Sequence, residues 1–330
     1  MEEQATSFGN VAESYDRVRP GPPAEALDWL VPAGCGLAVD LAAGTGLFTR
    51  ALAGRAAQVV AIEPDRRMRA VLARQSPQVR VLEGWGEEMP LPDGCADAVF
   101  VSTAWHWLDP ARAVPEIARV LRPGGRLGVV WTSRDRGQDW VAELDLLRLP
   151  GVSDQQDGDG GVGRVRTPDD VRAMLDREHS VTLPDGTCFR DTEGASFRFT
   201  RSLTVEDVVE WLATNSAFIT ASAADRAAGL DRCRAALLNR TGGASVIDMP
   251  MRSWCWRATR RPRLPKAAGI HKTGSRQDCA AGASPTICMW QRSTGVRTAG
   301  SHGNAPHRHT ELSRVGGAAV QCAASRSLPC

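Results

Sequence analysis

Lysine is almost missing from this chain of 330 residues, because the only two, Lys266 and Lys272, stand near its C-terminal end. Residues 1–261 hold 31 arginines against 36 acids, so acids are in excess there. A domain that binds nucleic acid through its phosphates is usually strongly basic. We therefore expect no nucleic-acid partner for this part of the chain.

Long apolar runs and a leader sequence are missing too. No stretch reaches the roughly 18 uncharged apolar residues of a membrane-spanning helix, and the acidic start Met1-Glu2-Glu3 lacks the basic and apolar regions of a signal peptide. A cytoplasmic protein without a membrane partner is expected. The nine cysteines form no C-x-x-C pair, which argues against a zinc ribbon or a redox dithiol, and no metal site is predicted.

The composition changes after Arg261. Residues 262–330 carry nine basic residues against Asp278 and Glu311, without a sustained apolar period. We interpret this segment as a basic, disordered tail. Its charges are spaced singly and lack aromatic neighbours apart from Trp290, which disfavours a nucleic-acid-binding tail. An accidental extension of the reading frame is the simpler interpretation.

What the chain does contain is a glycine-rich turn after an apolar strand, Ala38-Val39-Asp40-Leu41-Ala42-Ala43-Gly44-Thr45-Gly46. A second apolar run, residues 59–62, ends at Glu63. Such a turn brings backbone N–H groups close to a ligand, and an acid at the end of the next strand can accept both hydroxyls of a ribose. The two segments together predict a nucleotide site.

The residues around the turn discriminate between possible ligands. A dinucleotide such as NAD favours G-x-G-x-x-G, but Thr49 stands at the third glycine position, and a carboxylate at Asp40 would repel a pyrophosphate. The same carboxylate would attract an α-ammonium group. The pattern D-x-A-x-G-x-G followed by a strand-terminal Glu resembles motif I of the class I S-adenosylmethionine (SAM) dependent methyltransferases. A purely structural strand, turn and helix is a third interpretation.

Apolar strands alternate with amphipathic helices between Val39 and Thr132, as in a parallel sheet built from right-handed crossover units. Strands are expected at residues 37–41, 58–62, 79–82, 96–102 and 126–132, and helices near 46–54, 65–75 and 110–121. Ligands of such sheets bind at the carboxyl ends of the strands. Asp40, Glu63 and the segments after Leu82 and Val101 should therefore meet at one edge.

Three more segments resemble the same family, in the family's order. Residues 84–93 are similar to its G-x-A-E-x-L-P-L segment, with Gly86 in place of the usual alanine. Residues 97–100 resemble its fourth-strand D-x-V, and residues 121–127 its L-x-P-G-G-x-L turn. The resemblance covers the first 135 residues. It implies a Rossmann-like fold, SAM as the cofactor and methyl transfer as the activity.

Two further segments resemble a small-molecule methyltransferase subgroup. Residues 8–20 are similar to an F-x-x-x-A-x-x-Y-x-x-x-R-P lid, and Ala104-Trp105-His106-Trp107 to an A-x-H-W element. The lid implies that Tyr15 and Arg19 close over SAM, with Arg19 pairing the methionyl carboxylate. The alternative is an amphipathic helix that only packs. Pro22-Pro23 replaces the family's frequent Tyr-Pro, so an aromatic lid contact is missing.

The resemblance implies cofactor-binding residues in the lid and at the strand ends: Tyr15, Arg19, Asp40, Ala42, Gly44, Gly46, Glu63, Pro64, Trp85, Gly86, Glu87, Ser102 and Thr103. His106 is the candidate catalytic residue, a base for acceptors that must lose a proton, because imidazole titrates near neutrality. The alternative is a structural histidine, hydrogen-bonded beneath Trp105 and Trp107. Asp109 is a weaker candidate, since Asp before Pro110 also makes a good helix N-cap.

Residues 133–261 are expected to complete the sheet. The predicted elements are a flexible connector at 155–161, an edge strand at 196–203, helices at about 204–214 and 223–239, and a last strand at about 245–258. Trp140, Trp211 and Phe218 either line an acceptor pocket or belong to the core. The expected fold class is α/β: a Rossmann-like, seven-stranded, mostly parallel sheet with an antiparallel last strand, helices on both faces and a small helical cover.

We divide the chain into an N-terminal helical lid (1–36), a SAM-binding core (37–135), a part with connector, helical cover and last two strands (136–261), and the tail (262–330). The expected function is transfer of a methyl group from SAM to a small-molecule acceptor, by a monomer or weak dimer. The alternatives are an NAD(P)-dependent oxidoreductase and a non-catalytic SAM-binding domain. The acceptor atom cannot be read from the sequence.

Overall fold

The computed structural model describes residues 12–147 and 167–262, all within one compact unit. The first residues of the predicted lid, the predicted connector and nearly all of the predicted tail lie outside these ranges. No helix in the described ranges is long and apolar enough to cross a bilayer.

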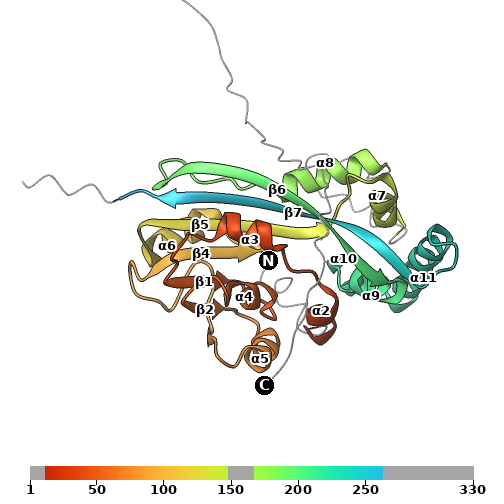
Figure 1. Ribbon diagram of the computed structural model, residues 1–330, viewed down its shortest axis with the longest axis horizontal. Coiled ribbons are helices and arrows are strands. Elements are labelled where there is room, and N and C mark those ends of the chain that lie inside the picture. The colour runs from red at the N-terminus through yellow and green to blue at the C-terminus, as the bar shows by residue number, and fades with distance from the viewer. Residues whose placement is uncertain (1–11, 148–166, 263–330) are drawn as a thin grey trace, which may run out of the picture. The chain divides into compact units, whose positions relative to one another are not determined.

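Within the described residues, seven strands form one sheet in the order β3-β2-β1-β4-β5-β7-β6 (Figure 1). They are β1 (Leu37–Leu41), β2 (Gln58–Ile62), β3 (Arg80–Leu82), β4 (Ala96–Ser102), β5 (Leu121–Arg134), β6 (Phe189–Thr204) and β7 (Val246–Arg260). Strands β1 to β5 pair in parallel, whereas β7 is antiparallel to both β5 and β6. The expected fold class is confirmed.

The described helices are α2 (Ala12–Val18), α3 (Ala24–Leu30), α4 (Leu47–Leu52), α5 (Arg66–Gln75), the 3-10 turn η2 (Trp105–Trp107), α6 (Pro110–Val120), α7 (Asp139–Leu146), α8 (Pro168–Glu178), α9 (Val205–Ala213), α10 (Ser216–Ile219) and α11 (Ala223–Arg240). Side chains set several of the helix starts. Asp109 accepts a hydrogen bond from the backbone of Ala111 and caps α6, and Thr204 and Asp207 form a capping box on α9. Helices α7, α8 and α10 were not predicted, whereas α3 lies within the predicted N-terminal helical lid.

Alternate residues of the central strands enter two different cores. Val39 and Val99 are fully buried against α6, whereas Ala38 and Phe100 are fully buried against α3 and α4. Because residues on both sides of these strands are apolar, both faces of the sheet have to be covered, and helices cover them.

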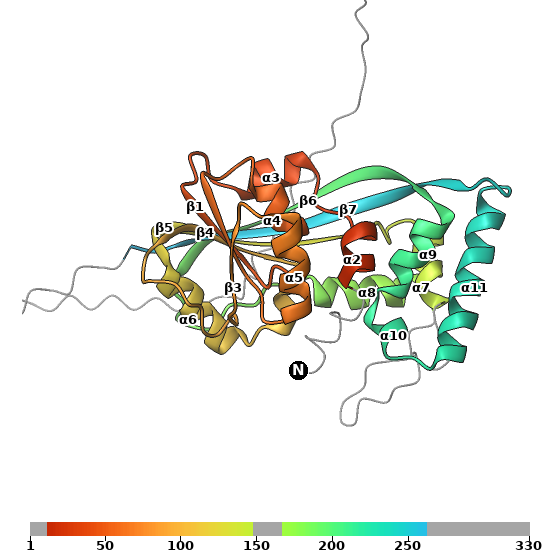
Figure 2. The same cartoon turned by 90° about the horizontal axis from the view of Figure 1, so that it is seen from below.

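Strands β5, β6 and β7 have 14 to 16 residues, whereas β1, β2 and β4 have five to seven. In Figure 2, β6 and β7 run from the sheet to α9 and α11. A third core fills this region and includes Met249, Met251, Trp211 and Phe218, all of them buried. Trp211 and Phe218 are thus core residues, and Trp140 packs against the same core.

Candidate functional site

A cavity of about 280 Å³ lies at the carboxyl ends of β1, β2 and β4, with residues of α2 and α8 in its wall. It collects twelve of the fourteen residues predicted for the site: Tyr15, Arg19, Ala42, Gly44, Glu63, Pro64, Trp85, Gly86, Glu87, Ser102, Thr103 and His106. Asp40 and Gly46 do not line it. In the described ranges, no group of three or more His, Cys, Asp or Glu side chains could hold a metal ion.

The two predicted glycines of the turn differ in role. Gly44 has a φ of +57°, and a side-chain carbon added there would meet nothing within 4 Å, so this backbone is open towards the cavity. Gly46 has a φ of +87° and stands at the start of α4, where an added carbon would lie 2.8 Å from Cγ of Leu72. Gly46 therefore lets α5 pack against the turn and does not border the cavity.

Two residues other than glycine hold a left-handed backbone at this edge. Ala42 follows β1 with a φ of +55°, and Thr103 follows the neighbouring strand β4 with a φ of +56°. This conformation costs free energy in residues with a side chain and is concentrated at ligand sites. Since both residues line the cavity, the strain marks this strand edge as the functional one.

Glu63 directly follows β2, and its carboxylate is buried. Its Oε2 accepts a hydrogen bond of 2.8 Å from the backbone of Gly44, and its Oε1 accepts one of 2.9 Å from the backbone of Asp65. Burial raises the pKa of this carboxyl above its usual range. Each carboxylate oxygen accepts more than one hydrogen bond, so Glu63 still has acceptor capacity for ligand hydroxyls.

Asp40 lies beneath the turn, fully buried. Its Oδ2 accepts a hydrogen bond of 2.6 Å from the hydroxyl of Thr49, and its Oδ1 has no partner among the described residues. Burial raises its pKa to about 7. Asp40 has the same strand parity as Ala38 and so points to the face covered by α4. Asp40 does not line the cavity, and its pairing with the ammonium group of SAM stays a prediction.

His106 lies on η2, in the wall of the cavity. Its ring centroid is 4.6 Å from that of Trp107, and no described residue hydrogen-bonds to its imidazole. Its side chain is exposed, yet the surrounding protein removes enough water to lower its pKa below the ordinary value. The structure does not show the alternative of a histidine fastened by hydrogen bonds beneath the tryptophans. The imidazole is available to a bound molecule.

Arg19 joins the lid to the helical cover. Its Nε donates to the hydroxyl of Thr214 at 3.0 Å, and its Nη2 donates at 3.1 Å to the carbonyl of Thr214 and to Oδ1 of Asn215. The guanidinium also lies 4.6 Å from the centre of the Tyr15 ring. Burial lowers the pKa of Arg19 from its usual value. Nη1 has no described partner, so one amino group remains for a ligand.

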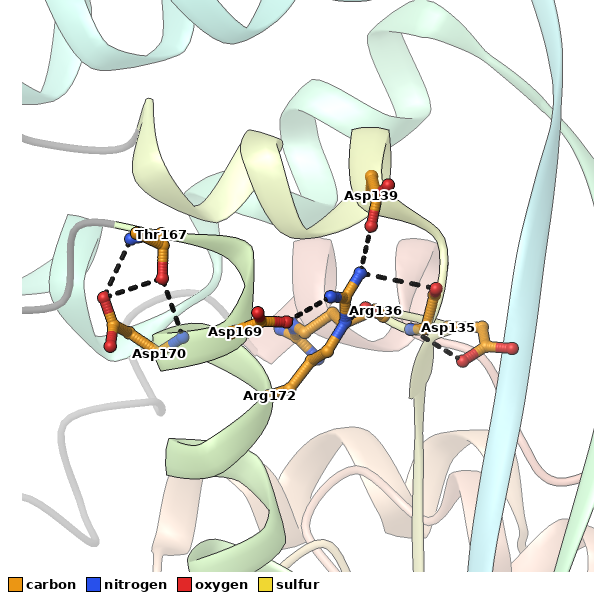
Figure 3. A network of polar contacts seen from close by, with 8 residues as sticks. Asp135, Arg136, Asp139, Thr167, Asp169, Asp170 and Arg172 are labelled. Atoms are coloured by element: carbon orange, nitrogen blue, oxygen red, sulfur yellow. Dashed lines mark hydrogen bonds and ion pairs between the residues drawn. The ribbon is translucent and has the colours of Figure 1, made fainter.

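The cavity residues that were not predicted include Arg136, Met174, Leu175 and Asn215. Arg136 lies two residues after β5, whose carboxyl end at Arg134 is two residues beyond the predicted end at residue 132. A correct strand end would have given the signal. Helix α8 begins with Thr167-Pro168-Asp169-Asp170, and Thr167 and Asp170 hydrogen-bond reciprocally (Figure 3). That capping pattern is legible in the sequence and would have placed Met174 on a helix.

Comparison with known proteins identifies the family. Residues 39–129 match the family described as a methyltransferase domain. A methyltransferase of Mycobacterium tuberculosis, itself uncharacterized, is 40% identical over 259 residues, which are 78% of this chain and 97% of the relative. The chain therefore belongs to the class I SAM-dependent methyltransferases.

Two further proteins are similar to this chain. The malonyl-[acyl-carrier protein] O-methyltransferase of Pectobacterium atrosepticum is 38% identical over 125 residues, which are 37% of this chain and 49% of that protein. The solved structure of a putative type II methyltransferase from Anaeromyxobacter dehalogenans covers 73% of this chain and 97% of its own, at 24% identity and a TM-score of 0.52. At that identity the likeness supports the fold alone.

Proposed function

We propose that the protein transfers a methyl group from SAM to a small-molecule acceptor. The observation that carries the proposal is one cavity that joins the glycine-rich turn and Glu63 to His106. The first two are suited to a nucleoside, and the third to a reacting acceptor. The cavity, at about 280 Å³, is near the lower end of small-molecule sites.

The donors and acceptors around the cavity fit SAM. Glu63 would hold the ribose hydroxyls, and the open backbone at Gly44 leaves room for the ligand to approach the turn. Pro64, Trp85, Gly86 and Glu87 would border the adenosine, and Tyr15, Arg19, Ser102 and Thr103 the methionyl part. The buried, unpartnered Oδ1 of Asp40 would favour a positive charge nearby.

The chain's own residues have to bind, align and keep water away, because the sulfonium of SAM already makes its methyl group electrophilic. His106 would take the proton of an acceptor hydroxyl or ammonium. Its lowered pKa keeps the imidazole neutral at pH 7, which is the form that can accept a proton. A monomer or weak dimer in the cytoplasm, without nucleic-acid partners, completes the proposal.

The test is a methyl-transfer screen with the full-length protein. SAM is offered with small hydroxyl, carboxyl and amine compounds, and S-adenosylhomocysteine is measured by mass spectrometry. With an accepting hydroxyl or amine, His106→Ala should lower kcat by about 100-fold, a typical effect of a general base, and leave SAM affinity within about two-fold. Glu83→Gln, at an exposed carboxylate that does not line the cavity, is the control, and Asp109→Asn tests the weaker candidate for the base.

Two results would contradict this reading. A large loss of SAM affinity in His106→Ala would make His106 a structural or cofactor-binding residue. Binding of SAM without turnover of any acceptor would favour the non-catalytic SAM-binding domain.

A further inference from the structure

Arg136 borders the cavity on the side away from Glu63. Glu63 follows β2 and Arg136 follows β5, with β1 and β4 between them in the sheet. At about 4.8 Å per strand, the two strand ends are roughly 14 Å apart. If Glu63 holds the ribose, Arg136 belongs to the part of the cavity beyond the nucleoside. Its neighbours in the cavity wall include Met174 and Leu175 of α8.

The loop that carries Arg136 is held in place from two sides (Figure 3). Asp135 accepts hydrogen bonds from the backbone of Gly137 at 3.0 Å and from Nε of Arg198 at 3.1 Å. Arg172 of α8 donates from Nε to the carbonyl of Arg136 at 2.9 Å, and it also pairs with Asp139. A backbone fixed in this way presents the Arg136 side chain in one position, as a binding residue requires.

Arg136 is buried, with 8% of the residue and 10% of its side chain exposed, yet the hydrogen bonds of its guanidinium are incomplete. Nε pairs with Oδ2 of Asp145, a carboxylate that also pairs with Arg134 through Oδ1. Nη1 donates to the hydroxyl of Ser133 at 2.9 Å, and Nη2 donates to no described residue. A buried cation that shares its only carboxylate and keeps a free donor is suited to an anion from outside the chain.

We propose that Arg136 binds an anionic group of the acceptor, a carboxylate or a phosphate monoester, through Nη2. The proposal rests on the proposed function, because it takes the Glu63 side of the cavity as the SAM side. Arg19 is the guanidinium left for the methionyl carboxylate, since it enters the cavity from the lid and already contacts Asn215. The two arginines thus serve different ligands.

The experiment measures binding of a small anion to the full-length protein saturated with S-adenosylhomocysteine. The probes are trifluoroacetate and its uncharged match trifluoroacetamide, followed by fluorine NMR. The wild type should bind trifluoroacetate at least about ten-fold more tightly than trifluoroacetamide, which is the effect expected of a charge-assisted hydrogen bond. Displacement by acetate or by inorganic phosphate then shows which of the two anionic groups the site prefers.

Three variants test the residue itself. Arg136→Gln should abolish the preference for the anion, Arg136→Lys should keep part of it, and Arg112→Gln, an exposed arginine on α6, should behave as the wild type. In Arg136→Gln, Asp145 still pairs with Arg134, which limits damage to the fold. If Arg136→Gln does not fold, the anion preference of Arg136→Lys tests the proposal instead, because lysine retains the positive charge.

The outcomes separate this inference from the proposed function. Equal binding of the two probes to the wild type would overturn the inference, as would an unchanged preference in Arg136→Gln. A loss of SAM affinity of about ten-fold or more in that variant would assign Arg136 to the cofactor and also overturn it. If the folded wild type binds no SAM, the proposed function itself fails.

Discussion

The cavity is built from two halves whose contacts differ in range along the chain. In the nucleotide half, Glu63 contacts Gly44, 19 residues away, and Asp40 contacts Thr49, nine residues away. In the cover half, Arg19 contacts Thr214, 195 residues away. Local contacts form wherever the strand, turn and helix form. Contacts between residues far apart in the chain, such as that of Arg19 with Thr214, form only once the whole sheet has been assembled.

The two halves also differ in chemistry. The nucleotide half presents backbone N–H groups and the carboxylate of Glu63, which suit a ligand with hydroxyl groups. The cover half presents the guanidinium groups of Arg19 and Arg136. The first half is expected to determine binding of the nucleoside, and the second binding of the methionyl carboxylate through Arg19, the stability of the cover and the choice of acceptor.

The largest effect is expected in the cover half, from Asp145→Asn. Asp145 is fully buried at its side chain and pairs with Arg134 and Arg136. Removing its charge takes away the carboxylate that both buried guanidinium groups share, which should lower the free energy of unfolding by about 3–5 kcal/mol. Urea unfolding measures this. Asp139→Asn, which removes an exposed partner of Arg172, is the control and should cost less than about 1 kcal/mol. Equal losses of unfolding free energy in Asp145→Asn and Asp139→Asn would contradict a stabilising role of the buried charge cluster.

Glu63→Ala should weaken SAM binding by about 100-fold, because two hydrogen bonds to a charged group contribute about 3 kcal/mol. Glu63→Gln retains an acceptor for Gly44 and for one hydroxyl, and should lose about ten-fold. Glu83→Gln, at an exposed carboxylate that pairs with Arg69, should lose nothing. Calorimetric titration measures all three. Affinity unchanged in Glu63→Ala would remove Glu63 from the cofactor site.

Asp40→Asn should change how stability depends on pH. The pKa of Asp40 is about 7 in the folded protein and about 3.9 in the unfolded chain. Between about pH 4 and pH 7 the folded state therefore keeps a proton on Asp40 that the unfolded chain has lost. Stability should therefore fall as the pH rises from about 4 to about 7 and then level off.

Asparagine has no charge to bury, so the wild type should lose about 4 kcal/mol of stability relative to the variant between pH 4 and pH 8. The asparagine amide donates where no acceptor is described, which lowers the stability of the variant at every pH by about 2 kcal/mol. The variant should therefore be less stable than the wild type near pH 4 and more stable at pH 8, by about 2 kcal/mol in each case. Urea unfolding of both proteins across this range provides the measurement. Parallel pH profiles would show that Asp40 is not the titrating group.

Thr204→Ala should have the smallest effect, a loss of about 1 kcal/mol in unfolding free energy, because it removes the capping box of α9. SAM affinity should stay the same, since Thr204 does not line the cavity. Thermal unfolding and SAM titration of the same sample measure both. A drop in SAM affinity would show that the two halves are coupled.

The sequence predicted the nucleotide half well, because its signals are local. Continuous apolar runs located β1, β2 and β4, and strand ends placed Glu63 and His106 at one edge. Asp40 does not line the cavity, because motif resemblance says nothing about the face to which a strand residue points. Strand parity, read beside Ala38, places its side chain on the face covered by α4.

The cover half was predicted less well, for physical reasons. The position of Arg136 depends on the length of β5, which is set by its antiparallel pairing with β7, more than a hundred residues later in the chain. Asn215 reaches the cavity through Arg19, a contact that no local pattern encodes. Met174 is the exception, because the capping residues at Thr167 and Asp170 marked the helix that carries it.

The central claim is that the cavity at the ends of β1, β2 and β4 binds SAM. The most direct measurement is calorimetric titration of SAM, S-adenosylhomocysteine and NADH into the full-length protein, with circular dichroism of the same sample to establish that it is folded. Our account predicts micromolar binding of SAM and S-adenosylhomocysteine and no binding of NADH. A folded sample that binds NADH, or that binds neither SAM nor its product, would contradict it.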